Sequence, residues 1–130
     1  MGKVIKVTKS FTFDAAHFLP NHKGKCSNMH GHTYKLEVTV MRDKGQLMTD
    51  GSDEGMVIDF SDLKSIVKSE VIDKVDHKLL NEVFSFRTTA ENMAAYIFDV
   101  LDQNLQPLGV KVERIKLWET PDSCAEVAYE

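Results

Sequence analysis

Three histidines are spaced as the ligands of one metal ion would be. His30 and His32 flank a single glycine at the start of an alternating segment, and residues two apart on a strand point to the same face. His17 ends the alternating segment before it. If these two segments pair as a hairpin, the three imidazoles meet at one end of a sheet. Three histidines with an open fourth position are typical of catalytic zinc; the alternative is ordinary surface histidines near a turn.

Cys26 lies four residues before His30, in a polar segment that contains glycine. Three interpretations are open: a fourth zinc ligand that closes the site, a thiolate base or nucleophile beside the metal, or a buried loop cysteine. The spacing alone does not separate them. The only other cysteine, Cys124, falls in a predicted strand and is assigned no role.

Carboxylates at three further positions suit a catalytic or binding site. Asp76 directly precedes His77, and such a carboxylate can orient the ring and hold its charged form, although the pair is also an ordinary helix end. Glu119 follows a tryptophan at a predicted strand end, where it could accept paired N–H bonds from an amino-heterocycle or be solvated. Glu91 follows Thr88 by three residues, the pattern of a helix-capping box.

Hydrophobic periodicity places these residues on an α+β framework. Alternation predicts strands over 3–13, 33–41, 110–119 and 125–129, and apolar residues at helical spacing predict helices over about 62–74 and 93–105. The register of the third strand breaks near Arg114, which indicates a bulge. The order β-β-α-α-β-β predicts an antiparallel four-stranded sheet with two helices on one face.

The composition fits one domain spanning residues 1–130, with 42% hydrophobic and 28% charged residues. A formal net charge of −4 and the absence of a basic run argue against nucleic-acid binding. No apolar stretch reaches the ~20 residues that a membrane span needs, and the first residues lack the apolar core of a signal peptide. We therefore expect a cytoplasmic protein with no membrane partner.

Four motifs, in order along nearly the whole chain, resemble the 6-pyruvoyltetrahydropterin synthase family. They are Phe13-Asp-Ala-Ala-His17, Cys26-Ser-Asn-Met-His30-Gly-His32-Thr-Tyr34, Asp76-His77 and Trp118-Glu119-Thr-Pro121. The combination is more specific than any of its parts. The pyruvoyl-forming branch of the family typically has a longer spacer between the cysteine and the His-Gly-His motif. The three-residue spacer here favours the bacterial branch that forms 6-carboxytetrahydropterin in the queuosine pathway.

The resemblance implies a tunnelling fold, a homo-hexamer with active sites between subunits, and 7,8-dihydroneopterin triphosphate as the substrate. It also implies Zn²⁺ as the cofactor and loss of the substrate side chain as acetaldehyde and triphosphate. The family's functional positions match zinc ligands (His17, His30 and His32), a catalytic base with its relay (Cys26 with Asp76 and His77) and pterin contacts (Glu119, Thr89 and Glu91). The family usually has proline before that threonine, and this chain has Thr88.

Three other functions are compatible with the same residues. The pyruvoyl-forming synthase shares all of them, and a non-catalytic zinc-binding domain would use Cys26 to close the metal shell. Another tunnelling-fold enzyme, such as a cyclohydrolase or an aldolase, is the third. Lys23 and Lys25 flank the cysteine loop and are candidate contacts for the substrate's phosphates.

Overall fold

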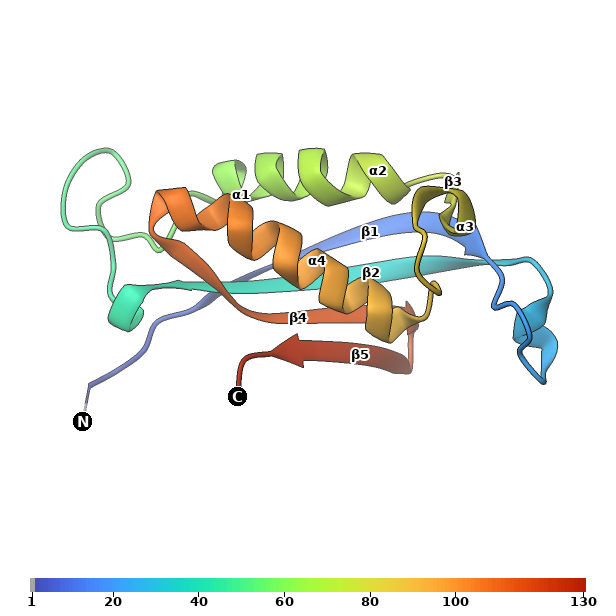
Figure 1. Ribbon diagram of the computed structural model, residues 1–130. Helices are drawn as coiled ribbons and strands as arrows, with labels where there is room; N and C mark the ends of the chain where they lie inside the picture. Colours follow the sequence, from blue (N-terminus) through green and yellow to red (C-terminus); the bar gives the residue numbers. More distant parts are fainter. Residues whose placement is uncertain (1) are drawn as a thin grey trace.

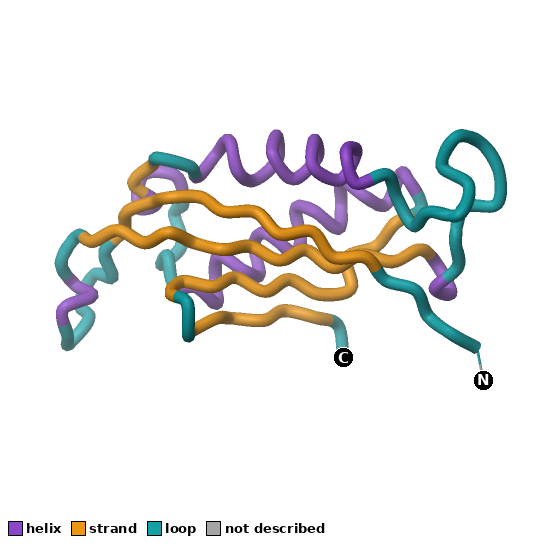
Figure 2. Tube along the Cα trace, turned by 180° about the vertical axis from the view of Figure 1, so that it is seen from behind, coloured by secondary structure: helices purple, strands orange, loops and turns teal. Residues whose placement is uncertain are grey.

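The structure, a computed structural model, describes residues 2–130 as a five-stranded mixed sheet covered on one face by helices (Figure 1). The strand order is β3-β1-β2-β4-β5. The strands are β1 (Val7–His17), β2 (His30–Arg42), β3 (Lys78–Leu79), β4 (Val110–Thr120) and β5 (Ser123–Ala128). Figure 2 shows the long strands side by side from behind. Within residues 2–130, no helix combines the length and the apolar character that a membrane crossing requires.

β1 and β2 pair as the antiparallel hairpin that the sequence predicts. Alternation along β1 and β2 turns one face of each strand toward the core, where Phe13 stacks on its cross-strand partner Tyr34 with ring centroids 4.8 Å apart. The register brings His17 opposite His30 at the end of the hairpin. The connecting loop contains a 3₁₀ turn over Lys25–Ser27.

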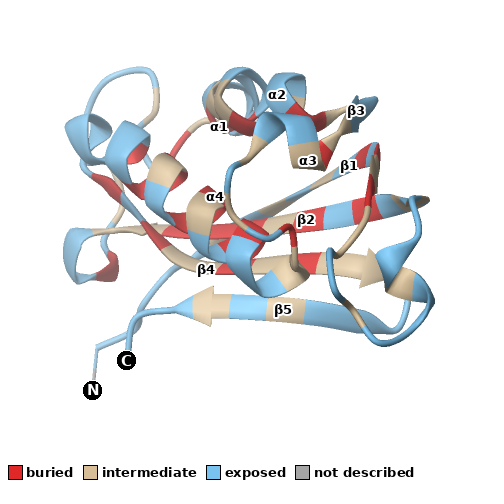
Figure 3. Cartoon of the chain, turned by 45° about the vertical axis from the view of Figure 1, so that its right-hand side comes forward, coloured by how far each residue is buried: buried red, intermediate tan, exposed pale blue. Residues whose placement is uncertain are grey.

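Three helical segments, two of them long, cover the apolar face of the sheet. The first runs continuously through α1 (Phe60–Val67), a π-helical turn (Lys68–Ile72) and α2 (Asp73–Val75); the others are α3 (Leu80–Val83) and α4 (Ala90–Leu105), which is followed by a 3₁₀ turn over Gln106–Leu108. Their apolar residues recur at helical spacing and are buried against the sheet. Figure 3 shows these buried positions between the helices and the strands.

The sheet differs from the predicted one by an extra strand. β3 is only two residues long and pairs parallel to β1 through Ala15 and Ala16, so the sheet is mixed and has five strands instead of four. Two residues are too few for alternation to reveal. The strand forms because the chain leaving α2 runs beside the end of β1.

The predicted capping box is also wrong in detail. The N-cap of α4 is Thr89, whose side chain accepts a hydrogen bond from the Asn92 backbone at 3.1 Å. Thr88 lies one residue earlier and is buried, so Glu91 has no capping partner there. The predicted N-cap is wrong by one residue because Thr88 and Thr89 are adjacent in the sequence.

A β-bulge in β4 decides which residues of this strand face the helices. Val112 pairs with Val40 and Arg114 pairs with Thr39, which leaves Glu113 as the extra residue. The buried positions therefore change from even to odd numbers, from Val112 to Ile115 and Leu117. The predicted register break is confirmed, and it turns the face that carries Glu119 toward the helix side.

Candidate metal centre and active site

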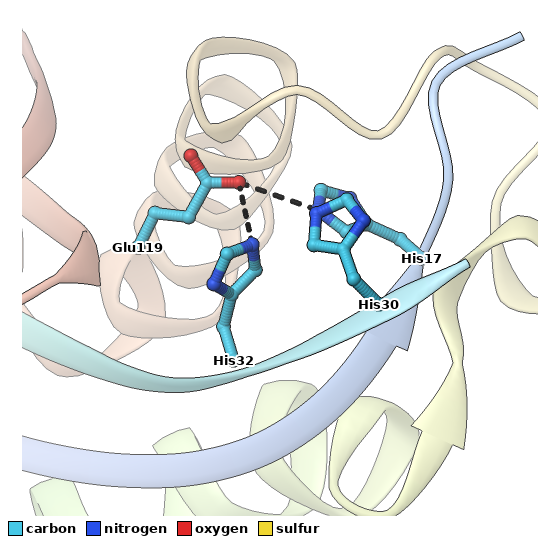
Figure 4. Close-up of side chains that lie close together, drawn as sticks. All are labelled: His17, His30, His32 and Glu119. Atoms are coloured by element: carbon cyan, nitrogen blue, oxygen red, sulfur yellow. Dashed lines mark ion pairs between the residues drawn. The ribbon is translucent and has the colours of Figure 1, made fainter. Parts of the chain in front are cut away.

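His17, His30 and His32 meet at one end of the sheet, as the hairpin prediction requires. The ring centroid of His17 lies 4.6 Å from that of His30 and 5.2 Å from that of His32. The ring centroids of His30 and His32 are 4.8 Å apart. Cross-strand pairing of His17 with His30 and the i, i+2 spacing of His30 and His32 place all three on the same face. Figure 4 shows the three rings and Glu119 pointing toward one another.

Backbone carbonyls orient two of these rings. The Nδ1 atom of His17 lies 2.9 Å from the Thr88 carbonyl oxygen, and that of His30 lies 2.8 Å from the Asn28 carbonyl oxygen. Because a carbonyl only accepts hydrogen bonds, each Nδ1 carries the proton and donates it. The lone pair is then on Nε2 in both rings, the arrangement of histidines that bind metals.

Glu119 completes a group of four candidate metal ligands. Its Oε1 lies 3.3 Å from Nε2 of His17 and 3.2 Å from Nε2 of His32. The four ligand atoms, with that of His30, all lie within 4.8 Å of one another. Nε2 of His17 and of His32 are buried and make no hydrogen bond within the described part of the chain. Buried nitrogens without a partner, aimed at one carboxylate oxygen, fit a bound cation, and imidazoles with a carboxylate are a zinc ligand set.

The surroundings of Glu119 and His32 favour the ligating forms of these two groups. The adjacent His17 ring holds the pKa of Glu119 below its ordinary value, although burial of the carboxyl opposes this shift. Burial lowers the pKa of His32, the other two histidines add to this effect, and Glu119 opposes it. Burial, followed by the nearby Glu119 charge, raises the pKa of Tyr34. A carboxylate and a neutral imidazole are both forms that bind metal.

A second group of ligand-type residues lies at the same end of the sheet. Asp14, Asp76 and His77 have side-chain atoms within 4.8 Å of one another and are more exposed than the histidine cluster. Asp14 and His77 border an open pocket of about 640 Å³, which His32 also lines. His77 adopts a left-handed backbone conformation with φ 59°, which is unusual for a residue with a side chain.

The remaining predicted site residues are dispersed in the single chain. Cys26 is half-buried in the 3₁₀ turn of the hairpin loop and, among residues 2–130, belongs to neither group of clustered ligand atoms. Glu119, and not Cys26, lies against the three histidines. Glu91 and Glu119 share a smaller cavity of about 230 Å³, and Thr89 caps the helix beside it. The roles assigned to these residues stay predictions.

Sequence reasoning missed three residues that contact the predicted site. Thr88 holds His17, Asp14 adjoins His77, and Tyr34 buries a hydroxyl without a hydrogen-bond partner in the described chain, its ring 5.5 Å from that of His32. Asp14 had one available signal, because it lies in the motif that leads to His17. Thr88 had none, since its contact joins residues that are distant in the sequence.

The fold and this cluster define an α+β protein with a candidate metal centre at one end of its sheet. The sequence model of the family described as 6-pyruvoyl tetrahydropterin synthase matches residues 6–130. The chain therefore belongs to the 6-pyruvoyl tetrahydropterin synthase family.

Individual relatives place the chain within this family. It is 43% identical to the 6-carboxy-5,6,7,8-tetrahydropterin synthase of Haemophilus influenzae, over 95% of this chain and 98% of that protein. It is 33% identical to the 6-pyruvoyl tetrahydrobiopterin synthase of Dictyostelium discoideum, over 95% of both proteins. The solved structure of the Caenorhabditis elegans 6-pyruvoyl tetrahydropterin synthase superposes with a TM-score of 0.77 and 30% identity, covering 100% of both chains.

Proposed function

We propose that this protein is a 6-carboxytetrahydropterin synthase that converts 7,8-dihydroneopterin triphosphate to 6-carboxytetrahydropterin, acetaldehyde and triphosphate. The observation that carries the proposal is the 43% identity to the Haemophilus influenzae enzyme over nearly the full length of both chains. Identity to the Dictyostelium relative, which is named for the pyruvoyl reaction, is lower at 33%. The reaction would be an early step of queuosine synthesis in the cytoplasm.

The residues at the end of the hairpin support zinc as the cofactor. His17, His30 and His32 would hold the ion through Nε2, because carbonyl oxygens fix the proton of His17 and of His30 on Nδ1. Bound zinc supplies a Lewis acid that polarises oxygen atoms of the substrate side chain. Glu119 lies close enough to join the ligands, or to turn toward a bound pterin and accept two of its N–H bonds.

The catalytic roles follow the chemistry of the individual side chains. Cys26 as a thiolate would remove a proton from the substrate side chain, and His77 would exchange protons on the opposite side. Asp76 would orient the His77 ring, since its Oδ2 lies 3.6 Å from Nδ1. Thr89 and Glu91 would contact the pterin ring beside Glu119, in the cavity that the two glutamates share.

The separation of these groups in one chain supports an active site completed by a second copy. Cys26 is absent from both ligand groups of residues 2–130, and Asp76 and His77 form a group apart from the histidine cluster. A homo-hexamer with sites between subunits would bring the groups of different chains together. Sedimentation of the protein tests the assembly directly.

The test of the reaction is incubation of the zinc-loaded protein with 7,8-dihydroneopterin triphosphate, followed by mass spectrometry of the products. We expect 6-carboxytetrahydropterin together with acetaldehyde. The pyruvoyl product would retain the site and overturn the choice of branch. An untouched substrate with zinc still bound would favour a non-catalytic zinc domain.

Two variants separate a catalytic cysteine from a structural one. Cys26→Ala should abolish turnover and leave zinc bound, whereas loss of zinc with the thiol would support a closed Cys–His₃ shell. Ser27→Ala in the same 3₁₀ turn is the matched control, because its hydroxyl donates a hydrogen bond to the exposed Gly24 carbonyl. For Glu119→Gln, loss of zinc would indicate a ligand, and a raised KM with zinc retained would indicate a pterin anchor.

A further inference from the structure

Asp14 of β1 holds the Asp76–His77 pair through its backbone. Its N–H donates to Oδ1 of Asp76 at 3.0 Å, and its carbonyl accepts the backbone N–H of His77 at 2.6 Å. These bonds lie where the chain leaves α2 and begins to pair with β1 as β3. They help to fix the left-handed backbone of His77, and any residue except proline can make them at position 14.

The side chain of Asp14 adds a contact that the backbone does not provide. Its Oδ2 lies 3.9 Å from Nε2 of His77, while Oδ2 of Asp76 lies 3.6 Å from Nδ1 of the same ring. The imidazole therefore lies between two carboxylates. Thr33, the cross-strand partner of Asp14, donates its hydroxyl to Oδ1 of Asp14 at 2.6 Å, which leaves Oδ2 for His77.

An open pocket lies beside this arrangement. The cavity of about 640 Å³ is bordered by Asp14, Thr33 and His77 and also by His32, one of the three clustered histidines. Lys78 is the cation among the residues that border it. A group of the substrate bound in this pocket would lie beside His77 and Asp14.

We propose that Asp14 is a positioning residue for His77, and that Thr33 orients Asp14 for this role. The inference rests on the proposed function, in which His77 exchanges a proton with the substrate. The Asp14 carboxylate restrains the ring from the side opposite Asp76, and it stabilises the positive charge that the ring gains when it takes up a proton. Both side chains are exposed, so the effect is modest compared with that of a buried ion pair.

Asp14→Asn is the decisive variant because it keeps both backbone bonds and removes the charge. We expect kcat to fall by roughly 5- to 30-fold and KM to change little. This factor is a part of the rate enhancement that a positioned acid–base group contributes. Thr33→Val should change kcat in the same direction by a smaller factor, and Asp14→Glu should restore part of it. Asp73→Asn is the matched control, because within residues 2–130 the Asp73 carboxylate pairs only with the exposed Lys68.

A double-mutant cycle shows whether the effect passes through His77. In a His77→Ala background, Asp14→Asn should cause no further loss of turnover, because the ring that it positions is gone. An equal loss in both backgrounds would overturn the proposal. An unchanged kcat in Asp14→Asn, with the wild type active, would overturn it as well.

A readout without substrate keeps this test separate from that of the proposed function. In the free protein, the NMR nitrogen chemical shifts of the His77 ring should move in Asp14→Asn and stay in place in Asp73→Asn. If the wild type fails to convert the substrate, the proposed function is wrong, while these shifts still decide whether Asp14 positions the ring. Identical His77 shifts in Asp14→Asn and wild type would overturn the Asp14 role.

Discussion

At the proposed zinc site, replacing Thr88 by valine should weaken metal binding without touching a proposed ligand. Thr88 is 1% exposed, and His17 Nδ1 contacts both its carbonyl oxygen at 2.9 Å and its hydroxyl oxygen at 3.2 Å. Valine has nearly the same shape as threonine, so the variant removes the hydroxyl contact and keeps the carbonyl bond. The ring then keeps its tautomer and loses part of its restraint.

The size of the effect follows from the contact that remains. A single intramolecular hydrogen bond has a net value of about 1 kcal/mol, which corresponds to roughly a fivefold change in Kd. Loss of the full support of a ligating histidine typically costs about 10- to 100-fold in metal affinity. Because the shorter bond to the Thr88 carbonyl survives, we expect the affinity to fall by about five- to tenfold.

Competition with a chromophoric zinc chelator at one fixed pH measures this change, since metal affinity depends on ligand protonation. Thr88→Ser keeps the hydroxyl and should bind zinc about as tightly as the wild type. Urea unfolding of the metal-free proteins checks that the fold is intact. A Thr88→Val affinity within about twofold of the wild type, or a Thr88→Ser variant as weak as Thr88→Val, would refute the reasoning.

Two further predictions concern stability. Burial and the neighbouring histidines hold the pKa of His32 below its ordinary value of 6.5, so the folded, metal-free protein binds fewer protons than the unfolded chain just below that pH. The free energy of unfolding should therefore fall as the pH drops below 6.5 through the lower folded value, and His32→Gln should flatten this slope in urea titrations. At His77, with φ 59°, glycine should give a free energy of unfolding about 1 kcal/mol higher than alanine, because only glycine adopts this conformation without strain; equal values would contradict the strain.

Most of the fold could be predicted because its elements are long and periodic. Alternation continues over several residue pairs of β1 and β2, and apolar residues recur at helical spacing over several turns of α4. The buried residues of these elements lie on the faces that the patterns predict. β3 escaped prediction because two residues carry no period, and it forms only through the contact with β1. The cap of α4 was misplaced because either of two adjacent threonines satisfies a local capping pattern.

The convergence of the three histidines could be predicted because strand geometry alone decides it. The spacing of His30 and His32 and the hairpin register bring the three rings together, as expected. The position of Glu119 against His17 and His32 depends on the bulge in β4. The sequence indicated the bulge, but it did not indicate that the bulge turns Glu119 toward these histidines. The support from Thr88 depends on a tertiary contact across 71 residues of sequence, which no local pattern encodes.

The bulge at Glu113 lets β4 carry one residue more than strict alternation allows, and the direction in which Glu119 faces depends on it. Deleting Glu113 would place Val112 and Ile115 two positions apart, so strict alternation would keep Val110, Val112 and Glu119 on one face. If the bulge were straightened with every residue kept, β4 would have to give up one of two things. With Val110 and Val112 in the core, Trp118 would face the helices and Glu119 would face away; with Glu119 on the helix side, the valines would be exposed. Straightening the bulge without a deletion is therefore expected to be as damaging as loss of Glu119, although Glu113 is not one of the clustered residues.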